Sequence, residues 1–283
     1  MTERKAVLAG SWYPGTGGGC RREIDAFIAA ADTAPPDDSR RWGGVVPHAG
    51  WAYSGSIACR VFHELSLWPP PDAVVVFGMH LRPSATACIM TRGAWQTPLG
   101  PVAIHESLAS ALADRFRFSR DRLQDFDRDN TIELQMPFIR HFFPETLFVP
   151  VGVPPTPAAV EMGAAVMNIA AAEAITVMVI GSTDLTHYGP NYGFMPEGGG
   201  PRAVEWVKSD NDRRVIQAIL DLDPRRVIQE GLQRSNACCS GAAAAAVAGA
   251  ASAGASAPRL LAYGTSFDVT PGASFVGYAG ILL

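Results

Sequence analysis

Residues 177–189 read Val-Met-Val-Ile-Gly-Ser-Thr-Asp-Leu-Thr-His-Tyr-Gly, and this stretch decides the fold class of the chain. Its first four residues form a short apolar run rich in β-branched side chains, which is typical of a buried strand. A glycine ends the run, and Asp184 and His187 follow at once. In open α/β sheets, ligands and catalytic groups gather beyond the carboxyl ends of the strands. The stretch therefore predicts a buried strand that carries an acid and an imidazole to a functional edge.

The same alternation of apolar runs and helical segments recurs along the whole chain. Further strands are expected at 45–46, 73–77, 147–151, 259–263 and 274–283, with a β-rich excursion over 86–104. Helical spacing occurs at 20–32, 106–116, 131–143, 157–173 and 202–232, a helix is expected from Ser56, and an alanine-rich run at 242–253 predicts a tightly packed helix. We expect an α/β fold whose central, mostly parallel sheet is flanked by helices. Because no clear linker interrupts the pattern, one domain spanning 1–283 is expected.

Composition excludes several classes of partner. Hydrophobic residues make up 48% of the 283 residues and charged residues 18%, which is enough apolar material for a large core. The net charge is −4 and Lys and Arg do not cluster, which argues against a nucleic-acid partner. Apolar runs stay well below the roughly 20 residues of a membrane span. Five cysteines without an export signal favour free thiols in the cytoplasm. A small-molecule substrate is expected, and a homo-oligomer is left open.

Three of the six histidines, His48, His80 and His187, directly follow a predicted strand. Neighbouring strands of one sheet would bring these imidazoles to the same edge, and imidazole is the commonest metal ligand in proteins. An anionic ligand could come from Asp184 or from a thiolate of the pair Cys238-Cys239, which precedes the alanine-rich helix and so sits where the helix dipole lowers a thiol pKa. Two His and one anionic ligand leave open positions for a substrate or O2.

Each of these residues also has a purely structural interpretation. A histidine at a strand end can be a hydrogen-bonded core residue, and Asp184 can cap a turn. Adjacent cysteines are usually small buried hydrophobes. Glu133 lies near the start of the 131–143 helix, where the helix dipole stabilises an acidic side chain. Tyr13 and Tyr53 can be packed aromatics.

Several ordered blocks resemble the Memo family. Residues 47–55, Pro-His-Ala-Gly-Trp-Ala-Tyr-Ser-Gly, are similar to its PHAGYxYxG motif. Further similar blocks follow the family's order and cover nearly the whole chain: 10–14 (Gly-Ser-Trp-Tyr-Pro), 132–138 (Ile-Glu-Leu-Gln-Met-Pro-Phe), 182–188 (Ser-Thr-Asp-Leu-Thr-His-Tyr), 263–268 (Tyr-Gly-Thr-Ser-Phe-Asp) and 276–279 (Val-Gly-Tyr-Ala).

This resemblance implies a fold similar to that of class III extradiol dioxygenases, which use non-haem Fe(II). It implies a metal pocket formed by His48, His80 and Cys239, with Cu or Zn as alternatives to Fe(II) because a cysteine is a ligand. It also implies that His187 is the acid/base, with Asp184 as its orienter or as a further ligand. Tyr13, Tyr53 and Glu133 are the residues assigned to substrate binding.

The chain departs from the family pattern close to this pocket. Met79 and Leu81 flank His80 where the family has a longer, two-histidine segment, and Asn130 stands where the family has a histidine. The leading hypothesis is an Fe(II)-dependent, dioxygenase-type oxidoreductase acting on a small, hydroxylated aromatic molecule. Two alternatives stay open: a metal-free thiol enzyme with Cys239 as nucleophile, His187 as base and Asp184 as orienter, and a non-catalytic binding protein that keeps the pocket.

Overall fold

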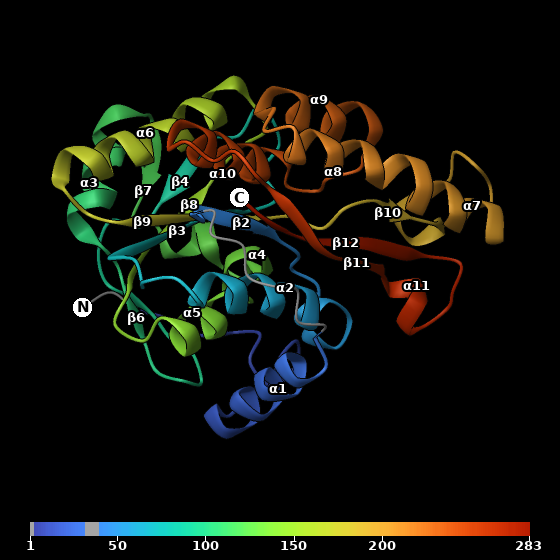
Figure 1. The fold of residues 1–283 in the computed structure, drawn as a ribbon, viewed down its shortest axis with the longest axis horizontal. Coiled ribbons are helices and arrows are strands. Elements are labelled where there is room, and N and C mark those ends of the chain that lie inside the picture. Colours follow the sequence, from blue (N-terminus) through green and yellow to red (C-terminus); the bar gives the residue numbers. More distant parts are fainter. Residues whose placement is uncertain (1–2, 32–39) are drawn as a thin grey trace.

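A central sheet organises the computed structural model, which describes residues 3–31 and 40–283 (Figure 1). Its strands follow the order β10-β12-β2-β9-β3-β8-β4-β7, and β11 also pairs with β12. Their bounds are β2 Gly43–Val46, β3 Ala73–Gly78, β4 Ala87–Ile89, β7 Phe118–Arg120, β8 Leu147–Gly152, β9 Val177–Ser182, β10 His187–Tyr188, β11 Arg259–Thr265 and β12 Phe275–Leu282.

The centre of this sheet is parallel and its flanks are antiparallel. Strands β2, β9, β3 and β8 run parallel to one another, and the apolar runs that predicted them are almost completely buried. Strand β12 runs antiparallel to β2, and β4 runs antiparallel to β8. The α/β fold with a mostly parallel central sheet is therefore confirmed, and the sheet as a whole is mixed. The expected excursion at 86–104 supplies β4 and, with β1 (Glu3–Arg4), a small second sheet containing β5 (Ala94–Trp95) and β6 (Val102–Ala103).

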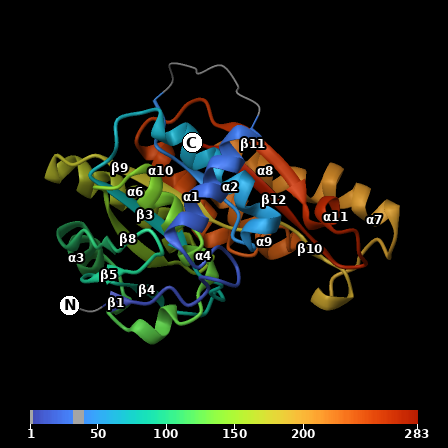
Figure 2. The ribbon, with the colours of Figure 1, turned by 90° about the horizontal axis from the view of Figure 1, so that it is seen from below.

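Helices cover both faces of the central sheet (Figures 1 and 2). One face carries α3 (Glu106–Arg115), α6 (Pro157–Glu173), α8 (Asp212–Leu220), α9 (Pro224–Arg234) and α10 (Ser240–Ser252). The opposite face carries α1 (Gly17–Ala29), α2 (Trp51–Ser66), α4 (Asn130–Glu133) and α5 (Met136–Phe142). Helix α7 (Pro201–Trp206) lies at the far end beside β10, joined to α8 by a π-helical turn, and α11 (Ser266–Val269) lies between β11 and β12.

Helix α10 packs against the sheet and α6 at backbone distance. A Cβ atom on Gly163 of α6 would lie only 1.9 Å from the carbonyl oxygen of Ala245, and one on Gly181 of β9 would lie 2.9 Å from that of Ala242. Small side chains on α10 permit this approach, which confirms the tightly packed alanine-rich helix. The packing fixes the N-terminus of α10, where Cys239 is the N-cap residue, beside the end of β9.

Helix α2 begins five residues earlier than the sequence indicated. It starts at Trp51 after Gly50, so the expected start at Ser56 is wrong. The first helical N–H, that of Trp51, donates to the carbonyl oxygen of Trp12 at 2.8 Å, so the helix needs no side-chain cap. Within the described ranges, each helix falls short of the length and apolarity that a bilayer crossing requires.

Candidate metal centre

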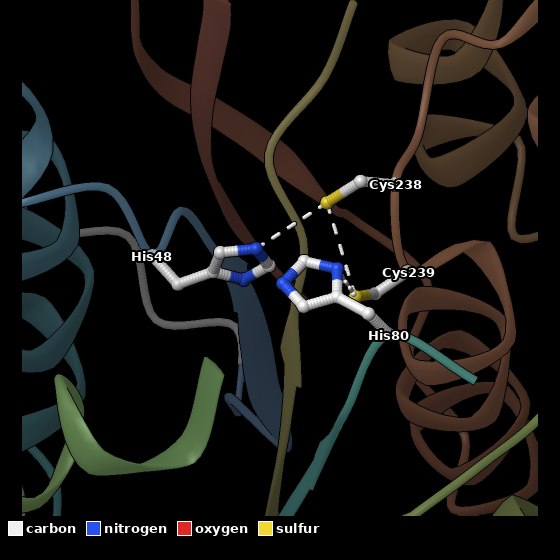
Figure 3. A group of neighbouring side chains, drawn as sticks. All are labelled: His48, His80, Cys238 and Cys239. Carbon is white, nitrogen blue, oxygen red and sulfur yellow. Dashed lines mark hydrogen bonds between the residues drawn. The ribbon is translucent and has the colours of Figure 1, made fainter. Parts of the chain in front are cut away.

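The register of the parallel strands brings the predicted ligands together. Val46 at the end of β2 pairs with Ser182 at the end of β9, and Phe77 of β3 pairs with Gly181. His48 and His80 each follow two residues after their strand ends, so both imidazoles project from the same edge. The N-terminus of α10 adds Cys238 and Cys239 from the side, and the four side chains converge on one point (Figure 3).

The donor atoms of this cluster lie within 4.8 Å of one another. The Cys238 Sγ is 3.3 Å from His48 Nε2, the Cys239 Sγ is 3.3 Å from His80 Nδ1, and the two sulfur atoms are 3.8 Å apart (Figure 3). His48 and Cys239 are buried, Cys238 is half-buried and His80 is exposed. Two imidazoles and a thiolate, with a second thiol beside them, form a donor set that suits Fe, Cu or Zn.

A buried serine sets the tautomer of His48. The Ser182 hydroxyl donates to the Thr131 carbonyl oxygen at 2.6 Å, so its oxygen acts as an acceptor toward His48 Nδ1, 3.0 Å away. When the ring is neutral, as a metal ligand must be, its proton therefore sits on Nδ1 and the Nε2 lone pair faces Cys238. Metal-binding histidines in proteins are oriented by hydrogen bonds of this kind.

Asn130 sets the tautomer of His80 in the same way. Its amide Nδ2 donates to the His48 carbonyl oxygen at 3.0 Å, which fixes Oδ1 as the atom 3.3 Å from His80 Nε2. The His80 proton is thereby placed on Nε2, and the Nδ1 lone pair faces Cys239. Asn130 is one of the departures from the family pattern, and here it supplies the hydrogen-bond acceptor that a metal-binding histidine needs. Both imidazoles thus fit a bound metal ion.

The titration behaviour of the cluster also favours a thiolate. Burial raises the pKa of the Cys238 thiol, but the hydrogen bond from Cys239 and the positive charge of His48 outweigh it and hold that pKa well below its ordinary value. Burial and the neighbouring Cys238 thiolate keep the pKa of Cys239 well above its ordinary value. Burial lowers the pKa of His48, whereas Asp184 and Cys238 raise it, to about 9 overall. A metal ion would displace these protons from its ligands.

Asp184 connects the two halves of the cluster. Its Oδ1 accepts the His48 backbone N–H at 2.7 Å, and its carbonyl oxygen accepts the Cys238 N–H at 3.1 Å. Its other carboxylate oxygen is 3.9 Å from His48 Nε2, on the side of the cluster. The preceding residue, Thr183, accepts the Cys239 N–H on its hydroxyl oxygen at 3.0 Å.

A cleft of about 790 Å³ opens onto the two imidazoles. Its lining includes His48, His80, Asn130, Asp184 and His187, and an aromatic group formed by Trp12, Tyr53, Tyr192 and Tyr278. The Tyr53 side chain is 41% exposed, so it is accessible to a molecule in the cleft, as its predicted substrate role requires.

His187 faces this cleft with a defined tautomer. Its Nδ1 is 3.1 Å from the Leu185 carbonyl oxygen, which can only accept, so Nδ1 carries the proton and Nε2 is free to act as a base. The edge of the ring packs against Tyr192 with centroids 4.9 Å apart. The orienting partner of His187 is therefore the backbone of Leu185, and the Asp184 carboxylate instead serves His48.

The remaining predicted site residues, Tyr13 and Glu133, lie in a buried network. The Tyr13 hydroxyl donates to Glu133 Oε1 at 3.1 Å, and Glu133 also accepts from Arg4 Nη1 at 2.6 Å and from the Leu8 N–H at 2.7 Å. Glu133 is fully buried and Tyr13 is 4% exposed. This network attaches the N-terminal segment to α4, which corrects the substrate-binding assignment of both residues to a structural one.

A second buried network, which the sequence analysis missed, supports the loop before His187. The Asp212 carboxylate accepts the Thr186 N–H at 3.0 Å, a short bond from the Thr186 hydroxyl and the Tyr263 hydroxyl at 2.8 Å. Burial raises the pKa of Asp212 to about 6. The signals in the sequence were Thr186 and Tyr263, which each belong to one of the family-like blocks.

Comparisons with known proteins agree with the sequence motifs. The family model described as "Memo-like protein" matches residues 4–282. A MEMO1 family protein from Methanopyrus kandleri is 33% identical over 99% of this chain and 98% of its own length, and one from Caldivirga maquilingensis is 30% identical over 99% of both. An uncharacterized protein, JW3007, from Escherichia coli K12 has a similar fold, with a TM-score of 0.53 at 15% identity over 79% of this chain and 91% of that one. Motifs, family model and full-length relatives together place the chain in the Memo family.

Proposed function

We propose that this protein is a metal-dependent oxidoreductase of dioxygenase type that acts on a small, hydroxylated aromatic molecule. The observation that supports this most is the pair of imidazoles, His48 and His80, whose lone pairs are directed at one point beside a cysteine and at the base of a cleft. His48, His80 and Cys239 would hold the ion. Fe(II) is the first candidate for this activity, and Cu follows because the thiolate is a soft ligand; Zn(II) would suit the same ligands but has no redox chemistry. A bound redox-active ion would supply electrons for a reaction with O2.

The residues of the cleft have definable tasks in such a reaction. The free Nε2 of His187 is suited to accept a proton from a substrate hydroxyl, since its other nitrogen is held by the Leu185 carbonyl. Trp12, Tyr53 and Tyr192 are each partly exposed around the cleft and offer flat surfaces to an aromatic ring. Asp184 keeps the backbone of His48 in place and adds negative charge beside its imidazole.

Metal content tests the first part of the proposal. Anaerobically purified protein, supplied with Fe(II), Cu(I) or Zn(II), is expected to retain about one ion per chain in elemental analysis. His48→Ala and His80→Ala should lose it, whereas His63→Ala, which removes a histidine from α2, should retain it. Wild-type protein that retains none of these ions would contradict the proposal.

Oxygen uptake tests the second part. The loaded protein should consume O2 with at least one member of a catechol panel. His187→Ala should keep the metal and lose roughly 10²–10⁴-fold in rate, the usual contribution of a general base. A metal-loaded protein that consumes no O2 with any hydroxylated aromatic would favour the non-catalytic binding function instead.

A further inference from the structure

We propose that Cys238 is a fourth metal ligand, so that this chain holds its ion with two imidazoles and two thiolates. The inference rests on the metal centre of the proposed function and specifies its ligand set. Cys238 is adjacent to Cys239, the cysteine that the family motif identifies as a ligand, and nothing in that motif assigns it a role. A ligand set with two thiolates would bind Fe(II) and would also suit thiophilic ions such as Zn(II) and Cu(I).

Three of the distances between the donor atoms are close to the edges of a tetrahedron around one ion. The edge of a tetrahedron is about 1.63 times the centre-to-corner distance, so metal–sulfur bonds of about 2.3 Å and metal–nitrogen bonds of about 2.0 Å require S···S near 3.8 Å and S···N near 3.5 Å. The two sulfur atoms are 3.8 Å apart, and each lies 3.3 Å from one imidazole nitrogen. Three of the six donor–donor distances therefore fit one four-coordinate ion, and all four donors lie within 4.8 Å of one another.

The loop after β9 fixes both sulfur atoms independently of any ion. The Cys238 N–H donates to the Asp184 carbonyl oxygen, and the Cys239 N–H donates to the hydroxyl oxygen of Thr183. The Thr183 hydroxyl also lies 3.7 Å from the Cys238 sulfur. Two consecutive residues thus hold two consecutive cysteines, which explains how adjacent side chains can point to the same place.

Cys20 and Cys59 show the surroundings of a buried thiol with a structural role in this chain. The Cys20 sulfur donates to the Pro14 carbonyl oxygen at 3.2 Å, and the Cys59 sulfur lies 4.0 Å from that of Ile24. Burial raises the pKa of both, to about 11 and about 12. The sulfur atom of Cys238, in contrast, lies 3.3 Å from Nε2 of His48, a nitrogen that can bind a metal ion. A cysteine that only fills apolar space in the core would not need a histidine nitrogen beside its sulfur atom.

Co(II) and Zn(II) provide the test, with Cys238→Ser, Cys239→Ser and Cys20→Ala as matched variants. The thiolate-to-cobalt charge-transfer absorption should be about halved in either serine variant relative to wild type and unchanged in Cys20→Ala. X-ray absorption of the zinc-loaded wild type should show two sulfur and two nitrogen neighbours, and one sulfur in Cys238→Ser. Zinc affinity of Cys238→Ser should fall by more than the roughly 10–100-fold that outer hydrogen-bond partners contribute.

The outcomes separate this inference from the proposed function. A Cys238→Ser protein with the cobalt spectrum and zinc affinity of wild type would overturn the fourth-ligand assignment while leaving the metal centre intact. A wild type that binds neither ion would overturn the fourth-ligand assignment, and one that also retains neither Fe(II) nor Cu(I) would overturn the proposed function as well. Circular dichroism and thermal unfolding of Cys238→Ser and Cys238→Ala confirm that the variants are folded, so a lost spectrum reports the ligand.

Discussion

Replacing Asn130 by alanine tests whether the orientation of the imidazoles controls metal affinity. Asn130 Oδ1 is the acceptor for His80 Nε2–H, and its Nδ2 donates to the His48 carbonyl oxygen, so one side chain holds both histidines. Without the acceptor, the neutral His80 ring can place its proton on Nδ1 and lose the lone pair that faces Cys239. We expect Asn130→Ala to weaken metal binding by about 10–100-fold. This corresponds to about 1.4–2.7 kcal/mol.

In Asn130→Ala, the free energy of unfolding should change less than the free energy of metal binding. Each of the two hydrogen bonds contributes about 0.5–1.5 kcal/mol, and water can replace part of them because Asn130 lines the cleft. The matched control is Asn130→Asp, which keeps an acceptor for His80, loses the donor to His48 and adds a negative charge that does not weaken the attraction for a cation. Its affinity should therefore stay closer to that of wild type than to that of the alanine variant.

A competition titration with a chromophoric chelator measures the dissociation constants for Zn(II). In the metal-free protein, the ¹⁵N chemical shifts of His80 report which ring nitrogen carries the proton. Equal zinc affinities for wild type and Asn130→Ala, together with an unchanged His80 tautomer, would refute the argument from hydrogen-bond geometry. A loss of affinity equal in the aspartate and alanine variants would show that the donor bond to His48, and not the acceptor, is the essential one.

Three further variants address the surroundings of the site. Ser182→Ala should weaken zinc binding by about 10–100-fold and also lower the free energy of unfolding by about 1–3 kcal/mol, because it leaves buried partners unpaired; titration and urea denaturation measure the two effects. Arg4→Met should cost about 3–5 kcal/mol in urea denaturation, since it leaves the Glu133 carboxylate buried without its cation, yet leave zinc affinity unchanged. The pKa of Asp212 is raised in the folded state from 3.8 to about 6, so its stabilising share is complete below pH 3.8 and lost as the pH rises through 6. Relative to Asp212→Asn, wild type should therefore lose about 2 kcal/mol between pH 4 and pH 7, and parallel stability curves for the two proteins would contradict this.

The parts of the site that the sequence predicted follow from the regularity of parallel sheets. His48, His80 and Asp184 each come directly after a buried apolar run, and the ends of such strands must meet at one edge. The family motif added Cys239, which is far from the histidines in the chain. The family spacing favoured Cys239, three residues after Asn236, but it could not show that Cys238 also faces the cluster, because the direction of each sulfur depends on the backbone at the N-terminus of α10. The structure brings both into the cluster.

The assignments that failed involve side chains whose role depends on tertiary partners. Tyr13 and Glu133 lie in blocks shared with the family, and a shared block does not say whether a side chain faces a cleft or the core. Their burial depends on Arg4, which reaches Glu133 across 129 positions of sequence. The role of Asn130 also depends on tertiary partners, so the sequence did not indicate it. Its side chain makes two hydrogen bonds to residues that follow two separate strands.

The end of β9 explains why the cluster can be assembled before any ion binds. Three consecutive residues each fix a different part of it: Ser182 holds the ring of His48, Thr183 holds the backbone of Cys239, and Asp184 holds the backbones of His48 and Cys238. These residues are buried and continue a strand whose register is set on both sides by β2 and β3. Ligands held in this way have little conformational entropy left to lose when a metal binds, so the folding of the sheet, and not the metal, supplies the order of the site.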